Sequence, residues 1–128
     1  MTTRDDVRSF LDRLMLPVTQ VAEDMWVIRT TEGAELVVHY APPVLVLRVR
    51  VMPLPDDVGK AGELARRLLE FNARDLVHGS YGVEGDHIVL TDALELTDLD
   101  FSEFQASVES LTMALSSHLS TLAPYGGK

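Results

Sequence analysis

The sequence predicts an α+β fold with the element order α-β-β-β-α-β-β-α, in which helices pack on a mainly antiparallel sheet. Three observations predict it. Residues 44–52 alternate so that a strand has two different faces. Residues 80–96 contain two alternating runs around the turn sequence E-G-D-H, which is typical of a β-hairpin. Three other segments carry apolar residues at helical spacing. Without internal repeats, the chain of 128 residues fits one domain, predicted at 3–122, with a C-terminal tail at 123–128.

The first helix is predicted to begin after Thr3, which forms a capping-box pattern with Asp6. Its apolar residues follow the spacing i, i+3, i+4, i+7 and form one stripe: Val7, Phe10, Leu11 and Leu14. Pro17 is predicted to end the helix, because proline has no backbone N–H to continue the hydrogen-bond ladder.

Three strands are predicted next, at residues 25–30, 35–41 and 44–52, with a turn at 31–34 between the first two. Pro42 and Pro43 interrupt the ladder before the third strand. The third strand has an apolar face and a mixed face. The apolar face is Leu45, Leu47, Val49 and Val51, and the mixed face is Val44, Val46, Arg48 and Arg50.

The second helix is predicted at about residues 61–77. Its apolar positions cover an arc of roughly 160°, whereas a helix buried on one side needs only about 100°. Something besides the domain core is therefore expected to cover this helix. The final helix is predicted to begin near Asp100, with Glu103 completing a capping pattern, and to end at Pro124. Its stripe is one-sided: Phe101, Phe104, Val108, Leu111, Leu115, Leu119 and Leu122.

The stretch H-G-S-Y-G at residues 78–82 raises the question of a serine nucleophile. A nucleophile elbow has the pattern G-x-S-x-G between a strand and a following helix. Here His78 stands in place of the first glycine, and a helix precedes Ser80 while a strand follows it. The pattern therefore favours a helix-to-strand turn, with Gly79 at a helix C′ position. A small enzyme or ligand-binding protein that uses His78, Ser80 and Asp86 remains an alternative.

The other polar residues indicate no metal, cofactor or catalytic site. None of His39, His78, His87 and His118 has the spacing of a metal motif, and a metal site would need His78, His87 and Asp86 to converge. We expect His118 to be a packed residue at the edge of the final helix's stripe. The acids between residues 92 and 103 do not match a calcium loop. There is no phosphate loop or dinucleotide fingerprint, so no cofactor is expected.

Composition excludes several classes of protein. The sequence has no cysteine, which excludes disulfides and cysteine-based zinc sites. Its net charge of −9 repels nucleic acid, and no basic stripe offsets that charge. The uncharged run at 110–127 contains four serines, two threonines, a histidine and a proline, so it is not a membrane span. The polar N-terminus shows no secretion signal, and we expect a cytoplasmic protein.

A protein-binding surface is predicted on the mixed face of the third strand. Val44 and Val46 are apolar where a solvated face should be polar, and Arg48 and Arg50 lie beside them. Val37 of the preceding strand points the same way. Such a half-apolar, half-charged face suits an extended peptide, which would also pair with the sheet through its main chain. The alternative is that a helix covers part of this face.

The element order, in a small acidic chain, resembles the class I type III secretion chaperones (the CesT-like family) and the related YbjN-type proteins. The likeness covers about residues 3–122. Its best segment is residues 68–96, where a leucine-rich helix ends near an asparagine and leads into a hairpin. The resemblance implies an α+β homodimer that holds an extended segment of a partner protein and has no catalytic residues. A YbjN-type regulatory or adaptor protein without a secretion client is the alternative.

The wide apolar arc of the second helix and the resemblance together predict the dimer contact. The residues predicted to form it lie on this helix and just after it: Leu64, Leu68, Leu69, Phe71 and Leu76.

Overall fold

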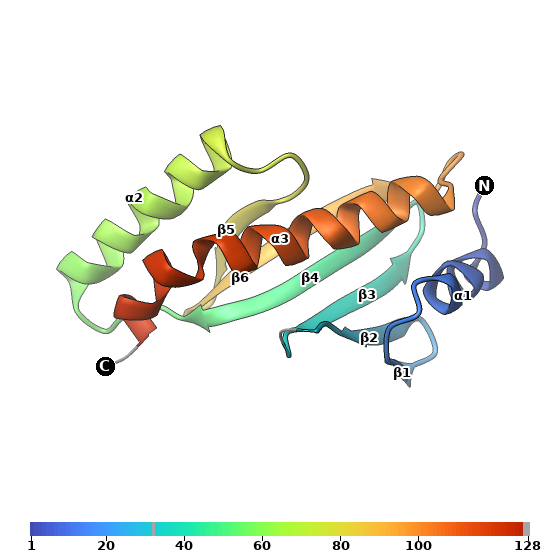
Figure 1. The fold of residues 1–128 in the computed structure, drawn as a ribbon, viewed down its shortest axis with the longest axis horizontal. Helices are drawn as coiled ribbons and strands as arrows, with labels where there is room; N and C mark the ends of the chain where they lie inside the picture. The colour runs from blue at the N-terminus through green and yellow to red at the C-terminus, as the bar shows by residue number, and fades with distance from the viewer. Residues whose placement is uncertain (32, 127–128) are drawn as a thin grey trace.

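The computed structural model describes residues 1–31 and 33–126, which form three helices and one six-stranded antiparallel sheet (Figure 1). The strand order is β1-β2-β3-β4-β6-β5. The elements are α1 (Arg4–Arg13), β1 (Val18–Ala22), β2 (Met25–Arg29), β3 (Glu35–Ala41), β4 (Val44–Pro53), α2 (Val58–Arg74), β5 (Ser80–Glu84), β6 (His87–Glu95) and α3 (Phe101–Gly126). The predicted α+β fold class is confirmed, with β1 as one additional strand.

The helices bury one face of the sheet, which we call the inner face. In Figure 1, α3 runs along β4 and β6, α1 lies beside β1–β3, and α2 lies alongside α3 next to β5. Leu45, Leu47 and Val49 of β4 are buried on the inner face, as their alternation predicts. They pack with Phe104 of α3 and Phe10 of α1 in a single hydrophobic core.

Strand β1 was not predicted, and α1 ends earlier than Pro17. The helix ends at Arg13, and Met15 adopts a positive φ of 60° before the chain turns into β1. Only Val18 of β1 is even half-buried, because β1 is an edge strand that borders β2 alone. An edge strand that buries so little has no strong apolar alternation, which explains why the pattern missed it.

Helix α2 begins and ends three residues before its predicted bounds. The side chain of Asp57 accepts a hydrogen bond from the backbone N–H of Lys60 at 2.8 Å and so caps the helix at Asp57. Helix α3 begins at its predicted position but continues past Pro124. The hydroxyl of Tyr125 donates to Glu63 of α2 at 2.8 Å, which holds the last turn in place.

The hairpin predicted at residues 80–96 is present, whereas Pro42 and Pro43, predicted to interrupt the ladder, join two paired strands. Pro42 and Pro43 form the two-residue connection between β3 and β4, where Ala41 pairs with Val44. Gly85 has a positive φ of 63° in the turn between β5 and β6, a conformation that glycine adopts without strain. Glu32 in the predicted turn at 31–34, and residues 127–128 of the predicted tail, lie outside the described residues.

Candidate protein-binding surface

All five residues predicted to bind a partner lie on the sheet face opposite to the helices, which we call the outer face. Val37 of β3 pairs with Arg48 of β4, and Val46 pairs with His39, so neighbouring strands bring these side chains together. The large apolar residues of β2, β3 and β4 that are half-buried on this face are Met25, Val27, Val37, Val44 and Val46. None of these five belongs to the core cluster that the helices cover.

Charged side chains surround these valines. Arg48 forms an ion pair with Glu84 of β5, with 3.1 Å between guanidinium and carboxylate, and Arg29 pairs with Glu35 at 2.6 Å. The Nε of Arg48 is buried and has no hydrogen-bond partner among the described residues. Arg50 is exposed. The two predicted rim arginines therefore differ, because Arg48 already has an acidic partner within the chain.

The two edges of the sheet are not equivalent. At β5, the side-chain amide of Asn72 on α2 donates to the carbonyl of Tyr81 at 3.1 Å and accepts from its N–H at 2.8 Å. Asn72 thus takes the place that a neighbouring strand would have. At the other edge, β1 pairs only with β2 in the described part of the chain, so the outward backbone groups of β1 can accept a further strand.

The residues predicted for a dimer contact separate into two groups. Leu64 and Leu68 are buried within the single chain, so the assignment of these two to a dimer contact needs correction. They face the sheet and α3, and a second copy cannot reach side chains that are already covered. Phe71 and Leu76 are half-buried against the core, and Leu69 is 66% exposed. Of the five, Leu69 offers the most surface to a partner.

A chain of side chains from three elements meets at the C-terminal end of α2. His118 of α3 is buried; its Nδ1 lies 2.8 Å from the hydroxyl of Tyr81, and its Nε2 lies 3.1 Å from a carboxylate oxygen of Asp75. Phe71 of α2 stacks against the same imidazole. Burial, together with the negative charge of Asp75, raises the pKa of Tyr81 to about 12. The packed role predicted for His118 is confirmed.

The candidate catalytic residues do not come together. Ser80 is the first residue of β5, and Asp86 lies in the turn beyond the other end of that strand. The carboxylate of Asp86 hydrogen-bonds His87 at 2.9 Å, and this bond lowers the pKa of Asp86. His78 lies 3.9 Å from Asp92. Neither the hydrolase arrangement nor the convergence of His78, His87 and Asp86 is present.

Gly79 explains the sequence H-G-S-Y-G. Its φ is +78°, and a Cβ at this position would lie 2.6 Å from the carbonyl oxygen of Thr91 and 2.7 Å from Leu111. Only glycine fits both the backbone conformation and the space. The helix-to-strand connection predicted for this stretch is confirmed, but Gly79 is not at the C′ position of α2, because that helix is capped at Asp75.

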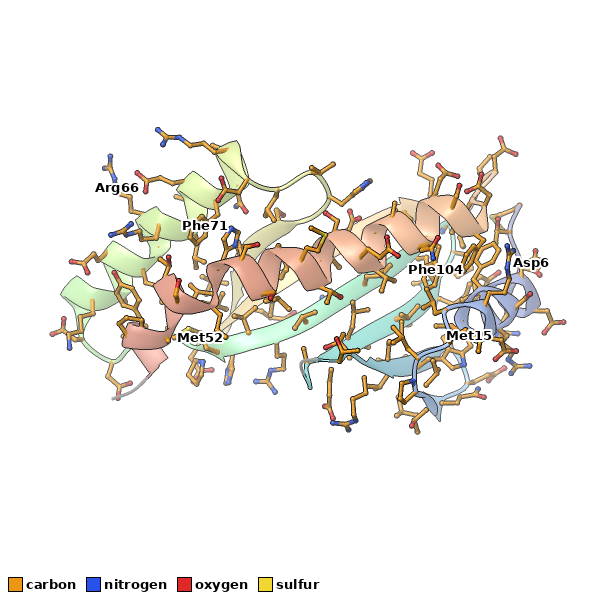
Figure 2. The ribbon with its side chains drawn as sticks, viewed as in Figure 1. Asp6, Met15, Met52, Arg66, Phe71 and Phe104 are labelled. Carbon is orange, nitrogen blue, oxygen red and sulfur yellow. The ribbon has the colours of Figure 1, made fainter. Side chains whose placement is uncertain are left out.

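Sequence reasoning missed an apolar groove on the inner face, between the C-terminal half of α3 and β4. Val51, Met52, Leu115 and Leu119 line this groove of about 450 Å³. Figure 2 shows Met52 beneath the last turns of α3. Leu119 belongs to the predicted stripe of α3 yet is 65% exposed. The sequence contained one signal for this groove: the apolar stripe of α3 is longer than the part of the sheet that α3 covers.

The described residues show neither a metal-binding cluster nor a membrane-spanning helix. They contain no group of three or more side chains that could hold a metal ion. None of their helices has the length and the apolar character that crossing a membrane requires.

Comparison with known proteins places these features in a family context. The family model CesT_Tir_1 matches residues 1–128. No curated protein matches the sequence. Three solved structures are similar over nearly the whole fold. The HopA1–SchA chaperone–effector complex contains a chain with a TM-score of 0.65 and 13% identity, covering 89% of this chain and 90% of that one.

The second is YbjN from E. coli, with a TM-score of 0.68, 14% identity and 93% coverage of each chain. The third is the heterodimeric ExoU–SpcU complex from the type III secretion system of Pseudomonas aeruginosa. Its TM-score is 0.65 and its identity 18%, covering 93% of this chain and 96% of that one. At these identities the likeness concerns the fold.

Proposed function

Because the chain belongs to the CesT_Tir_1 family, we propose that it is a non-catalytic module that holds an extended segment of a partner protein, as type III secretion chaperones do. The observation that carries the proposal is the outer face. Val37, Val44 and Val46 lie together on a sheet surface outside the core cluster. Binding of a partner that removes these half-buried valines from water lowers the free energy of the complex.

Strand addition at β1 supports the same proposal. The middle of the β5 edge is taken by Asn72, whereas β1 presents an open edge. A partner segment paired with β1 would extend the sheet through main-chain hydrogen bonds. Its alternate side chains would then lie next to Thr19 of β1, the outer-face residue that pairs with Val27 of β2. Main-chain pairing at β1 supplies affinity. Where the partner continues from β1 across the outer face to β3 and β4, the valines and Arg50 select its side chains.

The proposal includes a homodimer in the cytoplasm. The exposed Leu69 on α2 and the wide apolar arc of that helix support a contact between two copies. With Leu64 and Leu68 assigned to the core of one chain, and Phe71 packed on His118, the contact is centred on Leu69.

A second candidate is a YbjN-like regulatory or adaptor protein that has no secretion client. The structural similarity to YbjN, with a TM-score of 0.68, favours it as a candidate. The two candidates share the outer face and differ in the partner. A secretion apparatus or effector gene beside this gene would favour the chaperone.

The double substitution Val44→Asp with Val46→Asp tests the proposed surface. Both side chains lie outside the core cluster, so the variant is expected to fold and to keep the oligomeric state of the wild type. Two buried-charge penalties in the complex should abolish binding of the partner that the wild type retains from its own cell extract. A folded variant that retains the same partner would place the binding surface elsewhere, although α1 is a poor alternative because Val7 and Phe10 are buried in the core.

A further inference from the structure

A second groove lies on the helix side of the molecule, well away from the outer face. It is bounded by the connection from α2 to β5 and by the middle of α3, which lie beside each other in Figure 1. Its volume is about 560 Å³. Residues 75–78 form one wall, and residues of α3 between Ala106 and His118 form the floor and the other wall.

The walls of this groove are apolar and exposed. Val77 is 85% exposed and Met113 is 67% exposed, and the two come from opposite sides of the groove. The buried Ala114 lies on the floor between them. Filling such a groove with an apolar group removes these side chains from water, which favours binding.

The charges in the groove are of one sign. Asp75 and Glu109 both line it, and its lining contains no lysine or arginine. The carboxylate of Asp75 is half-exposed, and among the described residues its one hydrogen-bond donor is His118, at 3.1 Å. A carboxylate has room for further donors. His118 is itself held by Tyr81 and Phe71, so Asp75 has a fixed position before any ligand arrives.

We propose that this groove binds the side chain of a lysine or arginine on a protein partner. The aliphatic stem of such a side chain would lie between Val77 and Met113, and its cationic head would reach Asp75, with Glu109 adding negative charge further along α3. Lysine and arginine combine an apolar stem with a positively charged tip. The apolar walls of the groove match the stem, and its acidic residues match the tip. This site is separate from the outer face and does not depend on it.

An NMR titration with two short peptides tests the proposal. The probes are acetyl-Ala-Arg-Ala-amide and the same peptide with citrulline, which keeps the shape of arginine but has no charge. We expect the arginine peptide to shift backbone amide signals of residues 75–78 and 106–118, and the citrulline peptide to bind at least about fivefold more weakly.

Two variants locate the binding to this groove. Glu109→Gln should weaken binding of the arginine peptide about fivefold, because it removes one of the two carboxylates. Glu70→Gln makes the same charge change on the exposed surface of α2 and should leave binding unchanged. Three results would overturn the proposal: no signal shifts up to about 10 mM peptide, equal binding of the two peptides, or shifts confined to the outer face around Val37 and Val46. The last result would leave the proposed function intact.

Discussion

The imidazole of His118 lies face to face on the ring of Phe71, with ring centroids 3.7 Å apart and ring planes within 3° of parallel. The same imidazole contacts Tyr81 and Asp75, so one side chain of α3 joins α2 and β5. His118→Ala should therefore lower the free energy of unfolding by about 2–4 kcal/mol, since it creates a cavity and leaves the Tyr81 hydroxyl buried without its partner. Urea denaturation measures this loss.

The matched control is His39→Ala. His39 lies exposed on the outer face, and we expect its replacement to change stability by less than about 0.5 kcal/mol. Equal effects of the two substitutions would contradict the structural role of His118.

Tyr81 should make stability depend on alkaline pH. Burial raises its pKa from 10.0 to about 12, so the unfolded chain releases the phenolic proton first. The contribution of Tyr81 to the free energy of unfolding is complete below pH 10 and is lost as the pH rises through 12. The free energy of unfolding should fall over this range, and Tyr81→Phe should remove that part of the slope. An ultraviolet titration in which Tyr81 ionises near the ordinary tyrosine pKa of 10.0 would refute the assignment.

Acidic pH should weaken the helix caps. Backbone hydrogen bonds lower the pKa of Asp6 in the α1 cap and of Asp100 in the α3 cap below the ordinary 3.8. Groups with a lowered pKa stabilise the folded state above pH 3.8, and this stabilisation is lost as the pH falls below that value. Replacing both residues with asparagine should reduce the steepness of acid unfolding, as followed by circular dichroism. An unchanged slope would show that Asp6 and Asp100 do not contribute to acid unfolding.

Gly79→Ala should destabilise the fold by about 2 kcal/mol or more, because a Cβ meets the Thr91 carbonyl oxygen at 2.6 Å and the positive φ disfavours alanine. Gly82→Ala is the control, three residues along the same stretch. A Cβ at Gly82 meets nothing within 4 Å, so we expect a change below about 0.5 kcal/mol. Thermal unfolding of the two variants separates them, and similar melting temperatures would contradict the turn geometry.

Leu69→Arg should leave the folded chain as stable as the wild type, because Leu69 is 66% exposed within one chain. In the proposed homodimer the same change places a charge in the contact and should weaken association by at least about tenfold. Light scattering reports this as a shift from about twice 14.2 kDa toward 14.2 kDa. Leu119→Arg, with similar exposure on α3, should leave the mass unchanged. A wild-type protein with the mass of a monomer would contradict the proposed homodimer.

The sequence predicted the elements whose burial is one-sided and strong. Leu45, Leu47 and Val49 alternate because one face of β4 is covered along its length, and the caps at Thr3 and Asp100 have specific side-chain partners. Strand β1 escaped prediction because an edge strand with one half-buried residue leaves no periodic signal.

The site was predictable to a lesser degree. The outer face follows from the two-residue period of β4, so the positions of Val44 and Val46 could be inferred from the pattern. The grooves depend on how far α3 extends beyond the surface that it covers, which is a tertiary relationship. The apolar arc of α2 could not distinguish Leu68, which packs within its own chain, from Leu69, which does not.

The most direct test of the central claim is site-specific photo-cross-linking in cells that produce the protein. A photo-reactive amino acid is placed at position 46 on the outer face and, separately, at position 119 in the groove beside α3. The proposal predicts covalent adducts with a different protein from position 46 and a loss of those adducts when Val44 is also changed to aspartate. Adducts with a different protein from position 119 alone, with none from position 46, would contradict the assignment of the outer face as the partner-binding surface.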